Sequence, residues 1–322
     1  MSQQKKDNIV KTLVYGSSFL TVFILVFILG FIFIKGIPNI NMQFLTADYE
    51  DKTAYVNEID GKYYDMAGNE WKMKDTDIID KKEVVDGVTR LRVTRPGGGI
   101  VPMAVTTLYM ILLSLAVAAP IGIMAAIYLN EYAKQGKMVS LIRFAIQNLS
   151  GIPSIIYGLF GSLFFVQICK MGYSILAGAL TLSILLLPTI ISTTEETLKA
   201  IPMTYRESSL GLGATKFQTL TKVVLPNAVS GIVVAVILSI GRIVGESAAL
   251  LLTAGTVASI PSALTGDSAA GATLTIKAYT ILKEEGDIGT ACAIGVVLIV
   301  MIVILNTLAK VISNKYQKKQ GE

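Results

Sequence analysis

The sequence contains no histidine and only two cysteines among its 322 residues. Because Cys169 and Cys292 lie in separate apolar stretches, neither a zinc cluster nor a disulfide framework would have enough ligands. Charged residues are also scarce, at 16% of the chain, whereas 52% of the residues are hydrophobic. The mean hydropathy of +0.61 is too high for an ordinary soluble domain of this length and indicates that most of the chain lies in lipid.

The formal net charge of +5 raises the question of nucleic-acid binding. A nucleic-acid surface would need a basic stripe interleaved with aromatic side chains, and the sequence has none. The lysines and arginines instead fall mainly between apolar runs, where such charges set the orientation of membrane helices. We therefore interpret the positive charge as a determinant of how the helices are oriented in the membrane.

Six runs are long and apolar enough to span a bilayer, which takes about 20 mostly apolar residues. The first run is preceded by lysines, as in a signal peptide, but its core is too long and no A-x-A-like cleavage site follows, so we interpret it as an uncleaved helix. The predicted fold is an all-α polytopic membrane protein with both termini on one side. The six runs are Leu13–Ile34, Val101–Leu129, Phe144–Ile168, Ser174–Thr193, Val229–Leu251 and Ile288–Ile312.

The distribution of charge predicts that both termini are cytoplasmic. With the N-terminus inside, the short inner segments carry more basic than acidic residues, and the outer segments carry the reverse. The expected location is the cell membrane of a bacterium or archaeon, which the chain crosses several times. The predicted organisation is a membrane helix at 1–35, an extracytoplasmic insert at 36–99, a membrane core at 100–314 with a cytoplasmic loop at 194–228, and a tail at 315–322.

The insert at 36–99 is polar and carries two hairpin signals. Asp60-Gly61 and Asp86-Gly87 separate short runs of strand-forming residues, such as 83–85 and 88–93. One interpretation is a flexible connector. The other is a docking surface for an extracytoplasmic partner.

Three of the apolar runs contain a proline, namely Pro120, Pro153 and Pro188. Proline removes a backbone hydrogen bond, which lipid tolerates only where neighbouring protein or water satisfies the freed group. These runs are therefore expected in a packed bundle, either as simple packing kinks or as functional breaks.

The loop between the fourth and fifth runs contains a short amphipathic segment. Thr204 and Glu207 have the spacing of a capping box, which predicts a helix that begins near Tyr205. Small residues would let this helix approach another backbone closely, and the apolar residues Leu210, Leu212 and Phe217 would anchor it in a groove. The segment therefore has the properties of a docking element.

The same loop resembles the signature of ABC importer permeases, commonly written E-A-A-x3-G-x9-I-x-L-P. It departs from that pattern by serine for both alanines and by valine for isoleucine, which keeps the small or apolar character. The resemblance implies that the loop couples the chain to an ATPase, and the alternative is an interfacial helix without a partner. The predicted coupling residues are Arg206, Glu207, Ser208, Ser209, Gly213, Leu225 and Pro226. No Walker A pattern occurs in this sequence, so we expect ATP to bind a separate subunit, and this chain itself to be non-catalytic and to hold no cofactor.

Arg242 and Glu246 are charged residues inside the fifth run. They are four residues apart, which on a helix would place them on one face, and they are expected to pair. A charge at this depth costs at least about 2.5 kcal/mol, so both should face the bundle interior or a water-filled path. An arginine there could bind an oxyanion through two parallel hydrogen bonds, with Glu246 keeping the affinity low. The alternative is a buried ion pair that only fixes helix register.

The stretch 242–253 also resembles the R-A-I-G-E-T-A-P-L-L-x-T pattern of the PstA family of phosphate importer permeases. Further matching segments are 98–102, 127–132, 151–160, 194–196 and 278–280, whereas the insert lies outside the resemblance. Two positions depart from the family: Ala249 replaces a proline, and Ser192 stands where some relatives carry arginine. The resemblance implies phosphate as substrate, a second PstC-like permease, a dimer of PstB-like ATPases and a PstS-like extracytoplasmic binding protein.

Three alternatives to phosphate import remain open from the sequence. The coupling loop does not specify the cargo, so another oxyanion such as molybdate or sulfate is the nearest alternative. A secondary transporter or channel would need no coupling loop. A membrane-embedded hydrolase would need a nucleophile and a base, and the sequence has no histidine.

Overall fold

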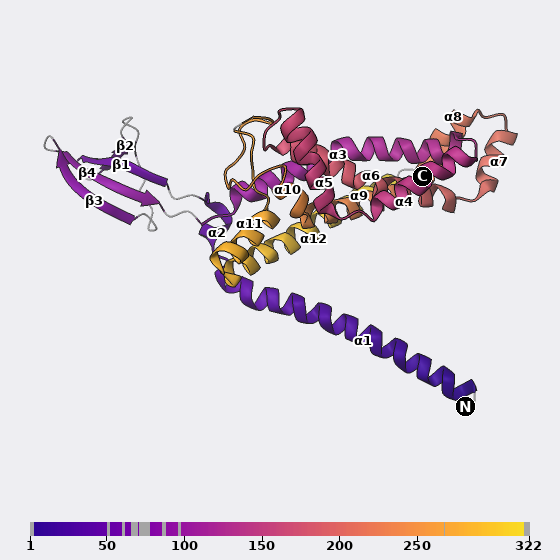
Figure 1. Ribbon diagram of the computed structural model, residues 1–322, viewed down its shortest axis with the longest axis horizontal. Coiled ribbons are helices and arrows are strands. Elements are labelled where there is room, and N and C mark those ends of the chain that lie inside the picture. The colour runs from indigo at the N-terminus through magenta and orange to yellow at the C-terminus, as the bar shows by residue number, and fades with distance from the viewer. Residues whose placement is uncertain are drawn as a thin grey trace.

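The protein is described by a computed structural model that covers residues 3–49, 52–59, 62–65, 70, 78–85, 88–95, 98–266 and 268–318. A helical bundle carries a small sheet at one end (Figure 1). The helices before the core are α1 (Gln3–Gly36), η1 (Ile37–Asn39) and α2 (Met42–Thr46). The core helices are α3 (Val101–Ile127), η2 (Tyr128–Tyr132), α4 (Lys137–Ser150), α5 (Ser154–Gly161), η3 (Ser162–Ile168), α6 (Ile175–Ala200), α7 (Met203–Gly211), α8 (Lys216–Thr219), η4 (Leu220–Val224), α9 (Leu225–Gly245), α10 (Ala248–Leu251), α11 (Leu274–Thr280), η5 (Ile281–Glu285) and α12 (Ile288–Lys318).

Among the described residues, five helices are long and apolar enough to cross a membrane, or six if one bent pair counts as a single span. The bent pair, Lys137–Ser150 with Ser154–Ile168, contains the predicted third span Phe144–Ile168, in which Pro153 was expected to mark a kink or a functional break. The chain turns by 99° between α4 and α5. Pro153 explains the turn, because it lacks an N–H and restricts the residue before it. The Tyr157 hydroxyl donates to the Leu149 carbonyl across the bend at 2.8 Å, which satisfies one of the freed groups.

Helix α6 lies at the centre of the bundle. Two thirds of its apolar window is buried, the largest share of any spanning helix, as expected for a helix that is apolar on all sides. It packs against α3, α9, α5 and α4. Pro120 and Pro188 lie within the continuous helices α3 and α6, so neither breaks its span.

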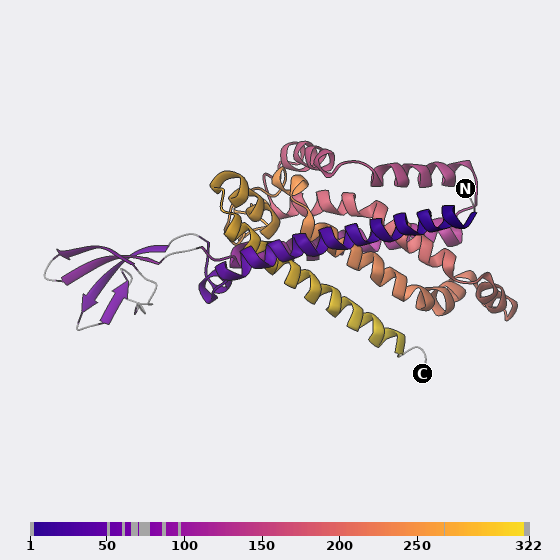
Figure 2. The same cartoon turned by 90° about the horizontal axis from the view of Figure 1, so that it is seen from below.

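Helix α1 is attached to the bundle mainly at one end. Gly36 lies directly against α12, since a Cβ atom there would come within 2.6 Å of the Cys292 carbonyl oxygen. From that point α1 runs away from the other helices (Figure 1), and its apolar window is 0% buried. The N-terminus, the C-terminus and α7 all lie toward the end of the molecule opposite the sheet (Figures 1 and 2).

The insert contains an antiparallel sheet and is more than a plain connector. Its strands are β1 (Lys52–Ile59), β2 (Lys62–Asp65), β3 (Ile78–Val85) and β4 (Val88–Arg95), in the order β2-β1-β4-β3. The predicted strands at 83–85 and 88–93 are confirmed within β3 and β4. The two predicted turns, Asp60-Gly61 and Asp86-Gly87, lie outside the described residues, although Ile59 pairs with Lys62 and Val85 with Val88 on either side of them.

The base of the insert is held against the bundle. The Gly98 N–H donates to the Tyr49 carbonyl, so the two ends of the insert are joined. Gly99 lies so close to Ala47 that a Cβ atom would come within 2.0 Å of its carbonyl oxygen. The Lys277 ammonium lies 4.0 Å from the centre of the Tyr49 ring, a cation–π contact that ties this base to α11.

We predict that Gly158→Ala destabilises the bundle. A Cβ atom at Gly158 would lie 2.7 Å from Ala249 Cα, so α5 and α10 must separate, at a cost of about 1–3 kcal/mol. The control is Gly241→Ala in α9, where a Cβ atom meets no other atom within 4 Å. The measurement is the thermal midpoint of the detergent-solubilised chain, which should fall for Gly158→Ala only. Equal midpoints would contradict the close packing of α5 on α10.

Candidate functional site

The loop between α6 and α9 forms a short helix, as predicted, but its start differs from the prediction. Helix α7 begins at Met203, and its N-cap Pro202 offers no side-chain hydrogen bond, so the expected capping box of Thr204 and Glu207 is wrong. The capping box lies instead at the start of α8, where Thr215 and Gln218 cap each other. The same spacing rule could have found it, because glutamine serves as well as glutamate at the third position.

The outer face of α7 and α8 is exposed and partly apolar. Glu207 and Ser208 are exposed, and Leu212 keeps 90% of its surface exposed. Gly213 follows with a positive φ of 89°, which turns the chain in a way that favours glycine. The Ser209 and Thr219 hydroxyls lie 2.9 Å apart, which ties α7 to α8. An exposed apolar tip on a fixed turn is suited to binding a groove of another protein.

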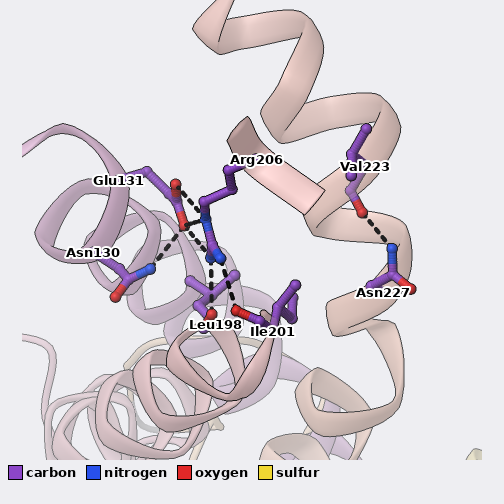
Figure 3. Close-up of polar contacts among 7 residues, drawn as sticks. All are labelled: Asn130, Glu131, Leu198, Ile201, Arg206, Val223 and Asn227. Carbon is purple, nitrogen blue, oxygen red and sulfur yellow. Dashed lines mark hydrogen bonds and ion pairs between the residues drawn. The ribbon is translucent and has the colours of Figure 1, made fainter. Parts of the chain in front are cut away.

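Arg206 points away from this face and into the protein (Figure 3). Its guanidinium pairs with Glu131 in η2, with Nη2 and Oε1 2.8 Å apart. It also donates to the Leu198 and Ile201 carbonyls at the end of α6. Glu131 was not among the predicted site residues, and only its place in the 127–132 resemblance pointed to it.

The end of the loop leads directly into the membrane helix. Leu225 and Pro226 occupy the first turn of α9, which continues without a break from the π-helix η4 (Leu220–Val224). The Asn227 side chain donates to the Val223 carbonyl at 2.7 Å (Figure 3). The loop motif therefore has an exposed part around Glu207–Gly213 and a half-buried part at Leu225 and Pro226 that joins it to α9.

Arg242 lies in α9, half-buried, and binds α6. Its Nη1 donates to the Thr189 hydroxyl at 3.1 Å. Among the described residues, this is the one hydrogen bond of the guanidinium, which has five N–H groups. Thr189 was missed, because its proximity to Arg242 depends on how α6 packs against α9 and leaves no sequence pattern.

The predicted pairing of Arg242 with Glu246 is wrong. Helix α9 ends at Gly245, and Glu246 is extended, with φ −82° and ψ 121°, so the two residues do not share a helical face. The buried Glu246 carboxylate instead accepts the Ala249 N–H at 3.0 Å, and so caps the short helix α10. The Thr275 hydroxyl donates to the Val244 carbonyl, which satisfies a second group at this break.

The replacement of the family's proline by Ala249 has a structural consequence. Proline has no N–H, so it could not make the bond that Ala249 makes to Glu246. The other departure, Ser192, lies in the C-terminal part of α6, beside Arg143, Glu195 and Lys199, in a pocket of about 90 Å³. In that pocket the Glu195 carboxylate is held by Arg143 at 2.7 Å and by Lys199 at 2.9 Å.

Known proteins with similar sequences are described as permeases or membrane components of transport systems. Residues 118–318 match the family described as the binding-protein-dependent transport system inner membrane component. The probable ABC transporter permease protein YqgI of Bacillus subtilis is 38% identical over 159 residues, which are 49% of this chain and 54% of that protein. YqgH of the same organism, also a probable ABC transporter permease protein, is 33% identical over 230 residues, covering 68% of this chain and 73% of that protein.

A phosphate transport system permease protein PstA homolog of Mycoplasma pneumoniae is 40% identical over 181 residues, which are 54% of this chain. The matched region spans about half the length of YqgI and 27% of the Mycoplasma protein. A bacterial alginate ABC transporter has a similar fold, with a TM-score of 0.55 and 16% identity over 68% of this chain and 79% of that one. This last likeness concerns the fold alone.

We predict that Glu246 is required as a hydrogen-bond acceptor at the break before α10. Glu246→Ala leaves the buried Ala249 N–H without its partner, which should cost about 1–3 kcal/mol. Glu246→Gln keeps an acceptor oxygen and should retain most of the stability. Thermal unfolding of both variants in detergent measures the difference, and equal losses for alanine and glutamine would contradict this role.

Proposed function

Since this chain belongs to the family of binding-protein-dependent transport system inner membrane components, we propose that it is the permease subunit of an ATP-driven phosphate importer. The observation that carries the proposal is the exposed helix α7, with Glu207 on its surface, Leu212 just beyond its end and Gly213 at the following turn. A helix presented in this way supports docking to a separate ATPase. The chain itself is a non-catalytic part of the assembly.

The partners follow from the same proposal. A dimer of ATPases binds α7 and a second, similar permease completes the translocation path. A binding protein delivers the substrate on the side of the sheet, opposite α7 (Figure 1). Among the relatives, the PstA homolog of Mycoplasma pneumoniae supports phosphate, while the names of YqgI and YqgH specify no cargo.

Arg242 is the residue we assign to the anion. Its guanidinium is half-buried and held by Thr189, which leaves N–H groups for a tetrahedral oxyanion. Glu246 caps α10, so in this proposal it supports the path and does not compete for the arginine. A weakly held anion is suited to transport, because the site must also release it.

The test is uptake of radiolabelled phosphate into proteoliposomes that contain this chain, a second permease and the ATPase, with binding protein outside and ATP inside. Uptake that requires ATP supports the proposal, and uptake without any ATPase would indicate a secondary transporter. Unlabelled sulfate and molybdate are added as competitors. Stronger competition by either anion than by phosphate would transfer the function to that oxyanion.

We predict that Arg242→Ala lowers phosphate uptake about tenfold or more, since a hydrogen bond to a charged group contributes about 1.5–3 kcal/mol. Thr189→Val removes only the group that orients the arginine and should have a smaller effect. Initial uptake rates, normalised to the amount of assembled complex, are the measurement. Full uptake by Arg242→Ala would eliminate this residue from the path.

We predict that Leu212→Asp prevents binding of the ATPase while the chain stays folded. Leu212 is 90% exposed, so a carboxylate there disturbs no packing in this chain but would be buried in the complex. The control is Leu108→Asp in α3, which is 40% exposed on a spanning helix and should destabilise the chain itself. Copurification of the ATPase measures binding, and undiminished copurification with Leu212→Asp would place the contact elsewhere.

A further inference from the structure

Arg206 differs from its neighbours in the exposed loop helix because it is buried. Only 8% of the residue is exposed, whereas Glu207 and Ser208 beside it are exposed. Its Nε and Nη2 both donate to the Glu131 carboxylate, at 3.2 and 2.8 Å to Oε1. Its Nη1 donates to the Ile201 carbonyl at 2.9 Å, and Nη2 also donates to the Leu198 carbonyl at 2.8 Å.

These bonds join α7 to the neighbouring helix α6 and to η2, which is distant from both in the sequence. Glu131 lies in η2, which continues α3, and Leu198 lies in the last turn of α6, with Ile201 directly after that helix (Figure 3). The carbonyls at a helix end lack partners within the helix and carry partial negative charge, which favours a cation there. A buried guanidinium with its N–H groups satisfied by a carboxylate and two carbonyls forms a specific joint, in contrast to an exposed ion pair.

Apolar packing around this joint is incomplete. A pocket of about 370 Å³ lies between α7 and the bundle, and its lining includes Met203, Glu207, Leu210 and the paired side chains of Arg206 and Glu131. Helix α7 is therefore not held to the bundle by continuous side-chain packing along its length. The polar bonds of Arg206 carry much of the connection.

Arg206 and Arg242, the arginine assigned to the anion, both bind the same helix, α6. Helix α6, whose end Arg206 binds, carries Thr189, which holds Arg242. Helix α6 is the most buried of the spanning helices, and a packed helix moves as a rigid element. A displacement of α7 that is passed to the end of α6 would therefore reach the centre of the bundle.

We propose that Arg206 and Glu131 are positioning residues that transmit movement of the ATPase-bound helix α7 to the inner ends of α3 and α6. The proposal rests on the proposed function, because it requires an ATPase on α7. Loss of the pair should leave the ATPase bound and active but reduce the phosphate imported per ATP hydrolysed. A purely structural pair would instead lower folding, assembly and both activities together.

The test is a double-mutant cycle in the reconstituted assembly. Glu131→Gln and Arg206→Gln should each reduce phosphate uptake per ATP about tenfold or more, and the double variant should be no worse than either, because both remove one interaction. Glu131→Asp keeps the charge and should restore part of the ratio. The control Glu196→Gln changes an exposed carboxylate on α6 near the same end and should leave the ratio unchanged.

A second readout does not depend on the cargo. In a chain whose Cys169 and Cys292 are replaced by serine, Ser192→Cys places a thiol near the end of α6. Trapping the ATPase with ATP and vanadate should change the rate of thiol labelling, and Glu131→Gln should abolish that change while the ATPase still copurifies. If the assembly that keeps Arg206 and Glu131 does not import phosphate, the proposed function is overturned, but the transmission role is not. A labelling change that survives Glu131→Gln, additive losses in the cycle, or loss of ATPase binding in the single variants would overturn the transmission role.

Discussion

The packing of α6 in the centre of the bundle is the constraint on which the rest of the structure depends. Three arginines from three different elements bind this one helix: Arg143 through Glu195, Arg206 through the Leu198 carbonyl and Arg242 through Thr189. Each charge avoids lipid by contacting a polar group that α6 presents along its length. The loop helix, α4 and α9 are therefore all attached to the same element.

The breaks in the membrane helices follow one rule: a freed backbone group finds a partner inside the protein. At the bend between α4 and α5 the partner is Tyr157, and at the end of α9 it is Thr275. At the start of α10 it is Glu246, through the N–H of Ala249. Two of these side chains act on the segment directly after Arg242, since Thr275 binds the Val244 carbonyl and Glu246 binds the Ala249 N–H.

Helix α7 has two faces with different tasks. Leu212, just beyond its end, and Glu207 are exposed, whereas Arg206 is directed into the bundle. In the proposed assembly α7 needs both faces, because binding energy gained on the outer surface has an effect in the membrane only if the inner face is firmly attached. Because a pocket lies beside the Arg206–Glu131 pair, the attachment of α7 to the bundle depends on a few polar bonds.

The sequence by itself determined the approximate places of the spanning segments, the short helix after Pro202 and the strands at 83–85 and 88–93. These features depend on local composition and on spacing within one segment. Only the tertiary structure decided the 99° angle of the bend at Pro153 and the partners of Arg206, Arg242 and Glu246. A spacing of four residues predicted that Arg242 pairs with Glu246, but α9 ends at Gly245, and α6 and Ala249 offered closer partners. Polar side chains in a bundle pair according to which helices pack together, and no segment contains that information alone.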